Sequence, residues 1–431
     1  MNALLLAAVL TAASAPLKFV ENDYPKALAE AKKAKVPLFV DATAPWCHTC
    51  IFMREHVLNR PELGVLQKRF VFLSLDTERP NSAAFLEKYP VDTWPTLLII
   101  DSQSDKVALQ WLGSANVEQF KKLLEDGEQA AKALGAQSAA DPLLQKLAEA
   151  DVLSGQRQPK AAAEAYRAVL AAAPADWPKR PRVTESLLGE LYAAKQSEDC
   201  ARTAAALVPA LPRGPSFANA TMWGLSCATA GSEKDAWRKD TEAPLVALAK
   251  EAVELPGLLA DDRSGLYELL VDAAGDGEAS VKLGQAWLTF LEGEAKAAKT
   301  PAARAVFDPH RVNAALAAHE PARVVDALKQ SEKDLPKDYN AAARLAVVYR
   351  ELGQLDDGLK ACDRALAKVY GPRTLRVLET KASILAKKGD LPGQRAVLTK
   401  ALETARALPQ SQKPKGAQER IEKALTALPQ G

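Results

Sequence analysis

Two patterns of apolar positions divide the chain into an N-terminal and a C-terminal part. Residues 38–42 have the pattern of a buried strand, and short apolar runs bounded by polar residues occur at residues 70–75 and 97–100. Runs of this kind are typical of central strands in a sheet that is covered on both faces. From residue 142 onward the strand signal vanishes, and the sequence is rich in alanine and leucine, with proline at the ends of segments. The pattern predicts an α/β domain followed by an all-helical region.

Between the strand-like runs, residues 24–33, 47–58 and 117–124 carry apolar side chains at helical spacing. Residues 106–111 could form a further strand at an edge of the sheet. The order of elements alternates between strand and helix at first and then becomes hairpin-like. This order predicts a mixed sheet with helices on its faces.

The helical region contains an internal repeat. The outline of residues 345–365, which includes a small residue at Ala346 and a glycine at Gly353, recurs thirty-six positions later at residues 381–401. Partial copies occur at residues 162–174 and 188–201. These units resemble tetratricopeptide repeats, in which small residues lie where paired helices cross. The resemblance implies a solenoid with a concave surface that suits peptides or partner proteins.

Composition sets the expected boundaries. A chain of 431 residues is long enough for at least two domains. Residues 126–141 are rich in Ala, Gly, Gln and Ser and are predicted to be a linker. The domains are therefore expected at residues 16–125 and 142–431, with irregular helical pairs at residues 230–336, where the repeat fits poorly.

The first fifteen residues have the features of a secretion signal. An apolar stretch at residues 3–10 is followed by Ala13 and Ala15 in the arrangement of a cleavage site. A signal peptide at residues 1–15 predicts a periplasmic or otherwise exported protein in an oxidising compartment. The alternative is a buried N-terminal helix or strand.

Charge argues against two classes of partner. The 56 basic and 54 acidic residues are intermixed and give a net charge of +2, with no basic stripe of the kind that binds nucleic acid. No apolar run after the leader reaches the length needed to span a membrane. We expect neither nucleic acid nor membrane as a partner once the leader is removed.

The pair Cys47 and Cys50 follows the first buried strand directly. A Cys-x-x-Cys pair can be half of a zinc site, a structural disulfide or a redox pair. Zinc needs four ligands, but no second pair occurs and His310 and His319 lie far away in the helical region, so no metal site is predicted. A structural disulfide across so short a loop would restrict the unfolded chain little. Thiol–disulfide exchange is the favoured interpretation.

The other three cysteines are scattered through helical segments. Cys200, Cys227 and Cys362 are expected to be small core residues, as free cysteine often is. A bridge between Cys200 and Cys227 is the alternative, which their spacing does not favour.

Further residues around the pair complete a known pattern. Asp41 lies in the buried strand, Trp46 precedes Cys47, and Trp94-Pro95-Thr96 stands immediately before the apolar run at residues 97–100. Together with Cys47 and Cys50, these positions resemble the thioredoxin superfamily over residues 20–125. Residues 57–63 look closest to the C-terminal thioredoxin domain of bacterial transmembrane disulfide reductases.

This resemblance implies catalytic roles. Cys47 would be the nucleophile, Cys50 the resolving thiol, and Asp41 a buried acid that relays the proton of Cys50. Desolvation should raise the pKa of Asp41, and Phe72 stands where thioredoxins often carry a lysine, which should make Asp41 harder to ionise. The alternative for Asp41 is a buried polar residue bonded to the backbone.

The resemblance also implies a substrate groove formed by Trp46, His48, Trp94 and Pro95, with Pro95 in the cis form and no cofactor. A structural alternative for Pro95 is a trans proline that begins a strand. His48, between the cysteines, could stabilise a thiolate when protonated or could be an exposed spacer.

Three functions are compatible with these features. The first is an exported thiol–disulfide oxidoreductase that acts on protein disulfides with an unidentified redox partner, while the helical repeats bind a partner protein. The second is a non-catalytic scaffold whose thioredoxin-like domain binds or senses redox state. The third is copper handling by Cys47, Cys50 and His48. The direction of exchange is not fixed by the two cysteines.

Overall fold

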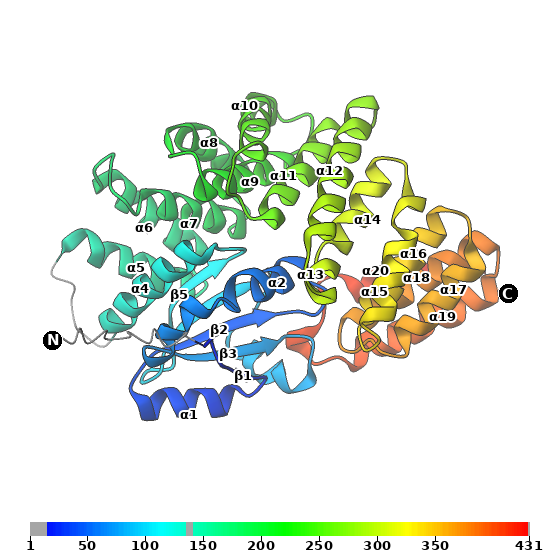
Figure 1. Ribbon diagram of the computed structural model, residues 1–431, viewed down its shortest axis with the longest axis horizontal. Coiled ribbons are helices and arrows are strands. Elements are labelled where there is room, and N and C mark those ends of the chain that lie inside the picture. Colours follow the sequence, from blue (N-terminus) through cyan, green and yellow to red (C-terminus); the bar gives the residue numbers. More distant parts are fainter. Residues whose placement is uncertain (1–14, 135–140, 430–431) are drawn as a thin grey trace, which may run out of the picture.

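The computed structural model describes residues 15–134 and 141–429 (Figure 1). The predicted leader, except for Ala15, lies outside these residues, as do residues 135–140 of the predicted linker. Among the helices in the described ranges, none combines the length and apolarity needed to cross a membrane.

The N-terminal domain is built on a mixed five-stranded sheet, as predicted. The order is β1-β3-β2-β4-β5, with β1, β3 and β2 parallel and β4 and β5 antiparallel to their neighbours. The predicted apolar runs form the three central strands. The strands are β1 (Phe19–Glu21), β2 (Leu38–Thr43), β3 (Val71–Asp76), β4 (Thr96–Asp101) and β5 (Lys106–Leu112).

Helices cover both faces of this sheet, because alternate side chains of each strand point to opposite sides. Leu38 and Val40 pack against the alanines of α1 and the apolar residues of α3, whereas Phe39 packs with Phe120 of α4 on the other face. The α-helices of this domain are α1 (Tyr24–Ala34), α2 (His48–Met53), α3 (Ala83–Lys88) and α4 (Val117–Leu134). A π-helical turn (Arg54–Leu58) continues α2.

The predicted linker is wrong at its start, because α4 continues to Leu134. Phe120, Leu124 and Ala131 are buried along one face of the whole helix. Gly127 lies within it because a Cβ at that position would stand 1.9 Å from Cδ1 of Ile99. The glycine therefore permits close packing on the sheet and does not mark a chain break.

The region from Asp141 onward, here called the arm, is helical throughout its described length apart from turns, as predicted. Its first helices are α5 (Pro142–Gly155), α6 (Pro159–Ala172), α7 (Arg180–Ala193), α8 (Ser197–Leu207), α9 (Pro215–Thr229), α10 (Ala236–Val253), α11 (Ala260–Ala274) and α12 (Glu278–Ala297). They continue with α13 (Pro301–Ala305), α14 (Asp308–Ala317), α15 (Val325–Asp334), α16 (Asn340–Glu351), α17 (Leu355–Leu366), α18 (Arg373–Lys388), α19 (Leu391–Ala407) and α20 (Ala417–Thr426).

The predicted repeat corresponds to two helix pairs, α16 with α17 and α18 with α19. Gly353 and Gly389 lie at equivalent turns between the paired helices, with φ of 71° and 74°. Glycine adopts this left-handed backbone without a steric cost, which explains its recurrence in the repeat.

A second disulfide corrects the expectation for two cysteines. Cys200 of α8 and Cys227 of α9 are joined, with an S–S distance of 2.01 Å, and both are fully buried. The prediction of core positions is right, but the prediction of free thiols is wrong. The antiparallel packing of the two helices, which the spacing in sequence does not reveal, places the sulfurs side by side. Cys362 is a buried free thiol.

The arm curves around the sheet, passing above it and along the side where α16 to α20 lie (Figure 1). Several side chains of the arm bond to the loops at the carboxyl ends of β2 and β3. Asn340 donates to the Pro45 carbonyl at 2.8 Å, and Gln412 donates to the carbonyls of Thr77 and Arg79. Apolar contact adds to this, because Phe52 of α2 is buried in an arm cluster with residues such as Trp287, Leu288 and Phe307.

Candidate active site

The two cysteines lie at the start of α2 and are bonded to each other. Cys47 is the N-cap residue, and the backbone N–H of Cys50 donates to Sγ of Cys47 at 3.1 Å. An N–H group directed at this sulfur stabilises negative charge on it in the reduced form. The side chains are almost closed to solvent, with Cys47 4% and Cys50 1% exposed.

The predicted substrate residues Trp46 and Trp94 lie beside the cysteines. Both indoles pack against the buried cluster of Ala44, Cys47 and Cys50, and their ring centroids are 5.1 Å apart. The peptide bond between Trp94 and Pro95 is cis. The fold thus brings together the turn after β2 and the loop before β4, which are distant in sequence.

Each indole is held by a polar partner. Nε1 of Trp46 donates to Oε1 of Glu78 at 3.0 Å, and Nε1 of Trp94 donates to Oγ1 of Thr77 at 2.9 Å. The other oxygen of Glu78 accepts from the backbone N–H of Arg373, whose guanidinium lies 4.9 Å from the Trp46 ring centre. Burial raises the pKa of Glu78, although these hydrogen bonds oppose the shift.

The same indoles form one wall of a cavity of about 620 Å³ that the arm closes on the opposite side. Its charged lining is predominantly basic. The basic residues are Arg373, Arg376, Lys413, Lys415 and Arg420, and the acidic ones are Glu78, Asp92 and Glu379. An extended segment that reaches the cysteines through this cavity would meet a surplus of positive charge.

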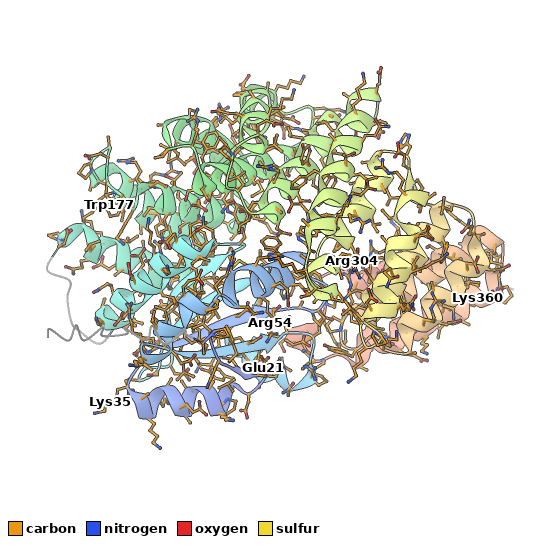
Figure 2. All side chains as sticks on the ribbon, viewed as in Figure 1. Glu21, Lys35, Arg54, Trp177, Arg304 and Lys360 are labelled. Carbon is orange, nitrogen blue, oxygen red and sulfur yellow. A yellow bond between two sulfur atoms is a disulfide. The ribbon has the colours of Figure 1, made fainter. Side chains whose placement is uncertain are left out.

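Asp41 is buried in β2, with 3% of its surface exposed. Burial raises its pKa to about 7, while the guanidinium of Arg54 partly opposes the shift. Arg54 forms an ion pair with Glu21 (Figure 2). Oδ1 of Asp41 has no hydrogen-bond partner among the described residues. A carboxyl group that titrates near neutrality and has a free oxygen suits proton transfer.

Phe72, predicted to stand where thioredoxins often carry a lysine, is fully buried on β3. It is paired with Phe39 in the sheet, and the two ring centres lie 5.4 Å apart. The residue paired with Asp41 is Ser74, so the strand position beside the buried acid carries a hydroxyl group and no cation.

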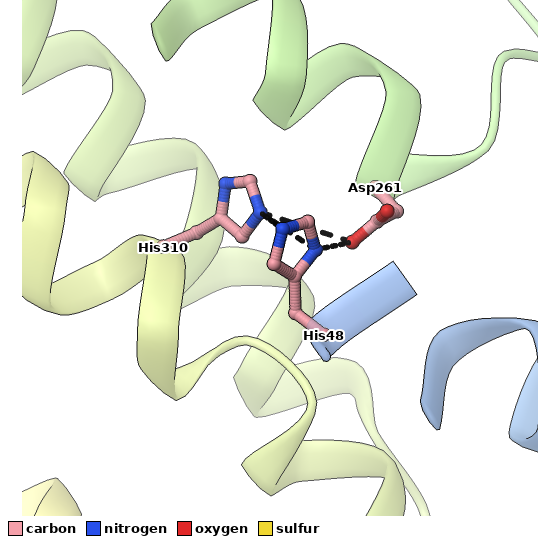
Figure 3. A group of neighbouring side chains, drawn as sticks. All are labelled: His48, Asp261 and His310. Carbon is pink, nitrogen blue, oxygen red and sulfur yellow. Dashed lines mark hydrogen bonds and ion pairs between the residues drawn. The ribbon is translucent and has the colours of Figure 1, made fainter. Parts of the chain in front are cut away.

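His48 is bound by the arm (Figure 3). Its Nδ1 lies 2.8 Å from Oδ1 of Asp261 on α11, and Nε2 of His310 on α14 lies 2.8 Å from the same Nδ1. The side chain of His48 is 33% exposed, but these contacts with the arm show that it is not a free spacer. The prediction that His310 lies far from the cysteines is wrong, because the curvature of the arm returns α14 to α2.

Strong electrostatic effects accompany this cluster. Burial alone would raise the pKa of Asp261, but the imidazole of His48 and the hydrogen bonds from His48 and Thr49 outweigh burial and lower the pKa to about 2. Burial alone would lower the pKa of His48, but Asp261 outweighs it and raises that pKa. Burial and the charge of His48 lower the pKa of His310 to about 3.

The sequence interpretation misses Asp261, Glu78 and Arg373. Asp261 lies in the first turn of α11 next to Asp262, which is an ordinary arrangement for the start of a helix. No local signal distinguishes it from other acidic residues of the arm. Its role depends on contact with a residue 213 positions away.

Comparisons with known proteins agree with the N-terminal fold. The model of a thioredoxin-like family matches residues 20–102. A curated relative, thioredoxin H-type of Oryza sativa subsp. indica, is 32% identical over 92 residues, which cover 20% of this chain and 69% of the relative.

Two solved structures are also similar. A putative disulphide-isomerase from Bacteroides thetaiotaomicron is 28% identical and has a TM-score of 0.24, covering 30% of this chain and 98% of that one. A tetratricopeptide repeat protein from Parabacteroides merdae is 9% identical and has a TM-score of 0.46, covering 66% of this chain and 97% of that one.

Proposed function

Since the chain belongs to the thioredoxin family through its N-terminal domain, we propose that it is a thiol–disulfide oxidoreductase acting on protein disulfides. One observation carries the proposal. The sulfurs of Cys47 and Cys50 are joined at the first turn of a helix, with the indole of Trp94, next to the cis Pro95, packed against them. This arrangement holds two sulfurs at bonding distance beside a surface for substrate.

In the reducing direction, the thiolate of Cys47 attacks a substrate disulfide, and one substrate sulfur leaves as a thiolate. The thiolate of Cys50 then attacks Sγ of Cys47 and releases the second substrate sulfur. The substrate gains two electrons, and Cys47 and Cys50 become the disulfide. Asp41 takes the proton that Cys50 loses, for which a pKa of about 7 is well matched to neutral pH. A second dithiol must reduce the pair again, and the same steps in reverse oxidise a substrate.

The arm contributes to client choice in this proposal. In this proposal a client approaches the almost fully buried cysteines from the cavity that is lined by Trp46 and Trp94, the two indoles that pack against them. The basic residues of the arm that line this cavity favour a client whose disulfide lies in an acidic, extended segment. The arm is thus proposed to bind the protein substrate as well as to support the domain.

Export is part of the proposal. It is supported by the apolar leader and by the buried Cys200–Cys227 disulfide, since such bonds persist mainly in oxidising compartments. Fractionation of bacterial cells that produce the chain with and without residues 1–15 tests this. Export predicts that only the full chain leaves the cytoplasm, and equal cytoplasmic retention of both would contradict it.

Reduction of insulin by dithiothreitol, followed by turbidity, tests the enzymatic proposal. The protein should accelerate the reaction, and Cys47→Ser should abolish the acceleration. Cys362→Ser is the matched control, because that thiol is buried and far in sequence from the pair. Equal rates for the wild type and Cys47→Ser would favour the scaffold alternative.

A further inference from the structure

We propose that His48, Asp261 and His310 form a binding site for a divalent transition-metal ion, such as Zn²⁺, between the thioredoxin domain and the arm. The ligands come from three elements, α2, α11 and α14 (Figure 3). The site uses neither cysteine, so it can be tested independently of the redox function.

The positions of the three ligand atoms fit a metal ion. Nδ1 of His48 lies 2.8 Å from Oδ1 of Asp261 and 2.8 Å from Nε2 of His310, and the latter two atoms are 4.0 Å apart. A point about 2.0 Å from all three atoms exists, which is the length of zinc bonds to imidazole nitrogen and carboxylate oxygen. It lies midway between Oδ1 of Asp261 and Nε2 of His310, so tetrahedral coordination requires these two atoms to approach each other and His48 to move outward.

The two arm ligands are held by further hydrogen bonds. Nδ1 of His310 bonds to Oγ of Ser264 at 2.5 Å, and that oxygen accepts from Nε1 of Trp287 at 2.6 Å, which leaves Nε2 of His310 facing the other ligands. Oδ2 of Asp261 accepts from the hydroxyl of Thr49 at 2.6 Å, which leaves Oδ1 facing His48. Partners of this kind orient metal ligands in proteins.

His48 is the adjustable ligand. The His48 and His310 rings are perpendicular, and Nε2 of His310 is almost equally distant from both nitrogens of His48, so it lies over the face of that ring. The His48 ring must therefore turn to aim its lone pair at a metal ion. Its side chain is the most exposed of the three, at 33%, compared with 6% for Asp261 and 3% for His310.

Ligand chemistry selects the class of ion. Two imidazole nitrogens and one carboxylate oxygen suit zinc and related first-row divalent ions, whereas magnesium and calcium prefer oxygen ligands. The carboxylate of Glu268 acts on His48 and favours a cation there, while the buried guanidinium of Arg344 opposes one. Three protein ligands leave a fourth position open for water or another small ligand.

Calorimetric titration of the full, oxidised, chelator-treated protein with ZnSO₄ tests the proposal. Keeping Cys47 and Cys50 as the disulfide removes thiolate ligands. We expect one zinc ion per chain, and Asp261→Asn and His310→Gln should each weaken binding by at least about tenfold. The matched control is His319→Asn. His319 is exposed and has a left-handed backbone conformation, which asparagine also adopts readily. The zinc affinity of this variant should equal that of the wild type.

X-ray absorption of the wild-type zinc complex gives a readout that does not depend on a variant folding. A shell with two imidazole ligands and no sulfur is expected. The proposal is overturned by the absence of saturable binding, by unchanged affinity in both ligand variants, or by a shell of oxygen atoms alone.

Discussion

The imidazole of His48 and the carboxylate of Asp261 lie 2.8 Å apart, although 213 residues separate them. One belongs to the turn between the cysteines and the other to the arm. The arm is therefore in direct contact with both residues between Cys47 and Cys50, since Thr49 also bonds to Asp261. Removal of Asp261 leaves His48 without its carboxylate partner, and removal of His48 leaves the buried carboxylate of Asp261 with the hydrogen bond from Thr49.

This contact should contribute to stability. In a double-mutant cycle with His48→Ala and Asp261→Ala, in the presence of chelator at pH 6, we expect a coupling free energy of about 1–3 kcal/mol from urea denaturation. The control cycle is the exposed pair Glu278 and Lys282, whose coupling should stay below about 0.5 kcal/mol. Additive effects of the two active-site substitutions would show that the contact does not stabilise the fold.

Asp41 should make stability depend on pH. Its folded-state pKa, about 7, is above the ordinary value of 3.8, so the folded state binds more protons than the unfolded state between these values. Stability must therefore fall as the pH rises through this range. From pH 5 to pH 8 the wild type should lose about 1–3 kcal/mol more than Asp41→Asn, measured by urea denaturation at each pH. Parallel pH profiles would contradict a buried, neutral Asp41.

The strands and the position of the cysteine pair could be predicted from sequence because they depend on local patterns. Continuous apolar runs identify the buried strands, and the cysteines and Pro95 stand at fixed positions next to these strands. The paired helices α16 to α19 of the arm could be predicted for the same reason, since Gly353 and Gly389 mark equivalent turns between them.

Features that depend on the path of the arm could not be predicted. The approach of His310 to His48 and the pairing of Cys200 with Cys227 follow from how helices stack, which no local pattern encodes. The start of the predicted linker was wrong for a different reason. A composition rich in Ala, Gly, Gln and Ser occurs in linkers and also in helices that pack closely, and only the contact of Gly127 with Ile99 decides between the two.

Gly371 should be required where the arm meets the domain. Its φ is +61°, and a Cβ there would stand 2.2 Å from the Glu78 carbonyl oxygen. Gly389 has a similar φ of +74° but open space around it, so Gly389→Ala should incur only the backbone cost of about 1 kcal/mol. Gly371→Ala should destabilise by about 1 kcal/mol more, measured by denaturation, because Glu78 and its loop must move. Equal effects would mean that the junction adapts freely.

The basic cavity should select clients by charge. Peptide disulfides flanked by Asp or Glu should react faster than the same peptides flanked by Lys, and the ratio of kcat/KM should shrink as salt is raised. Arg376→Ala and Lys413→Ala together should reduce this preference, whereas Lys360→Ala, on an exposed part of α17 (Figure 2), should not. A preference that is independent of these arm residues would place client recognition elsewhere.

Capture of a mixed disulfide on Cys47 tests the central claim most directly. Reduced Cys50→Ala protein, mixed with a synthetic acidic peptide disulfide and analysed by peptide mass spectrometry, should hold one peptide on Cys47, because the resolving thiol is absent. No adduct at Cys47 while its thiol is free, or an adduct only at Cys362, would contradict nucleophilic exchange at this site.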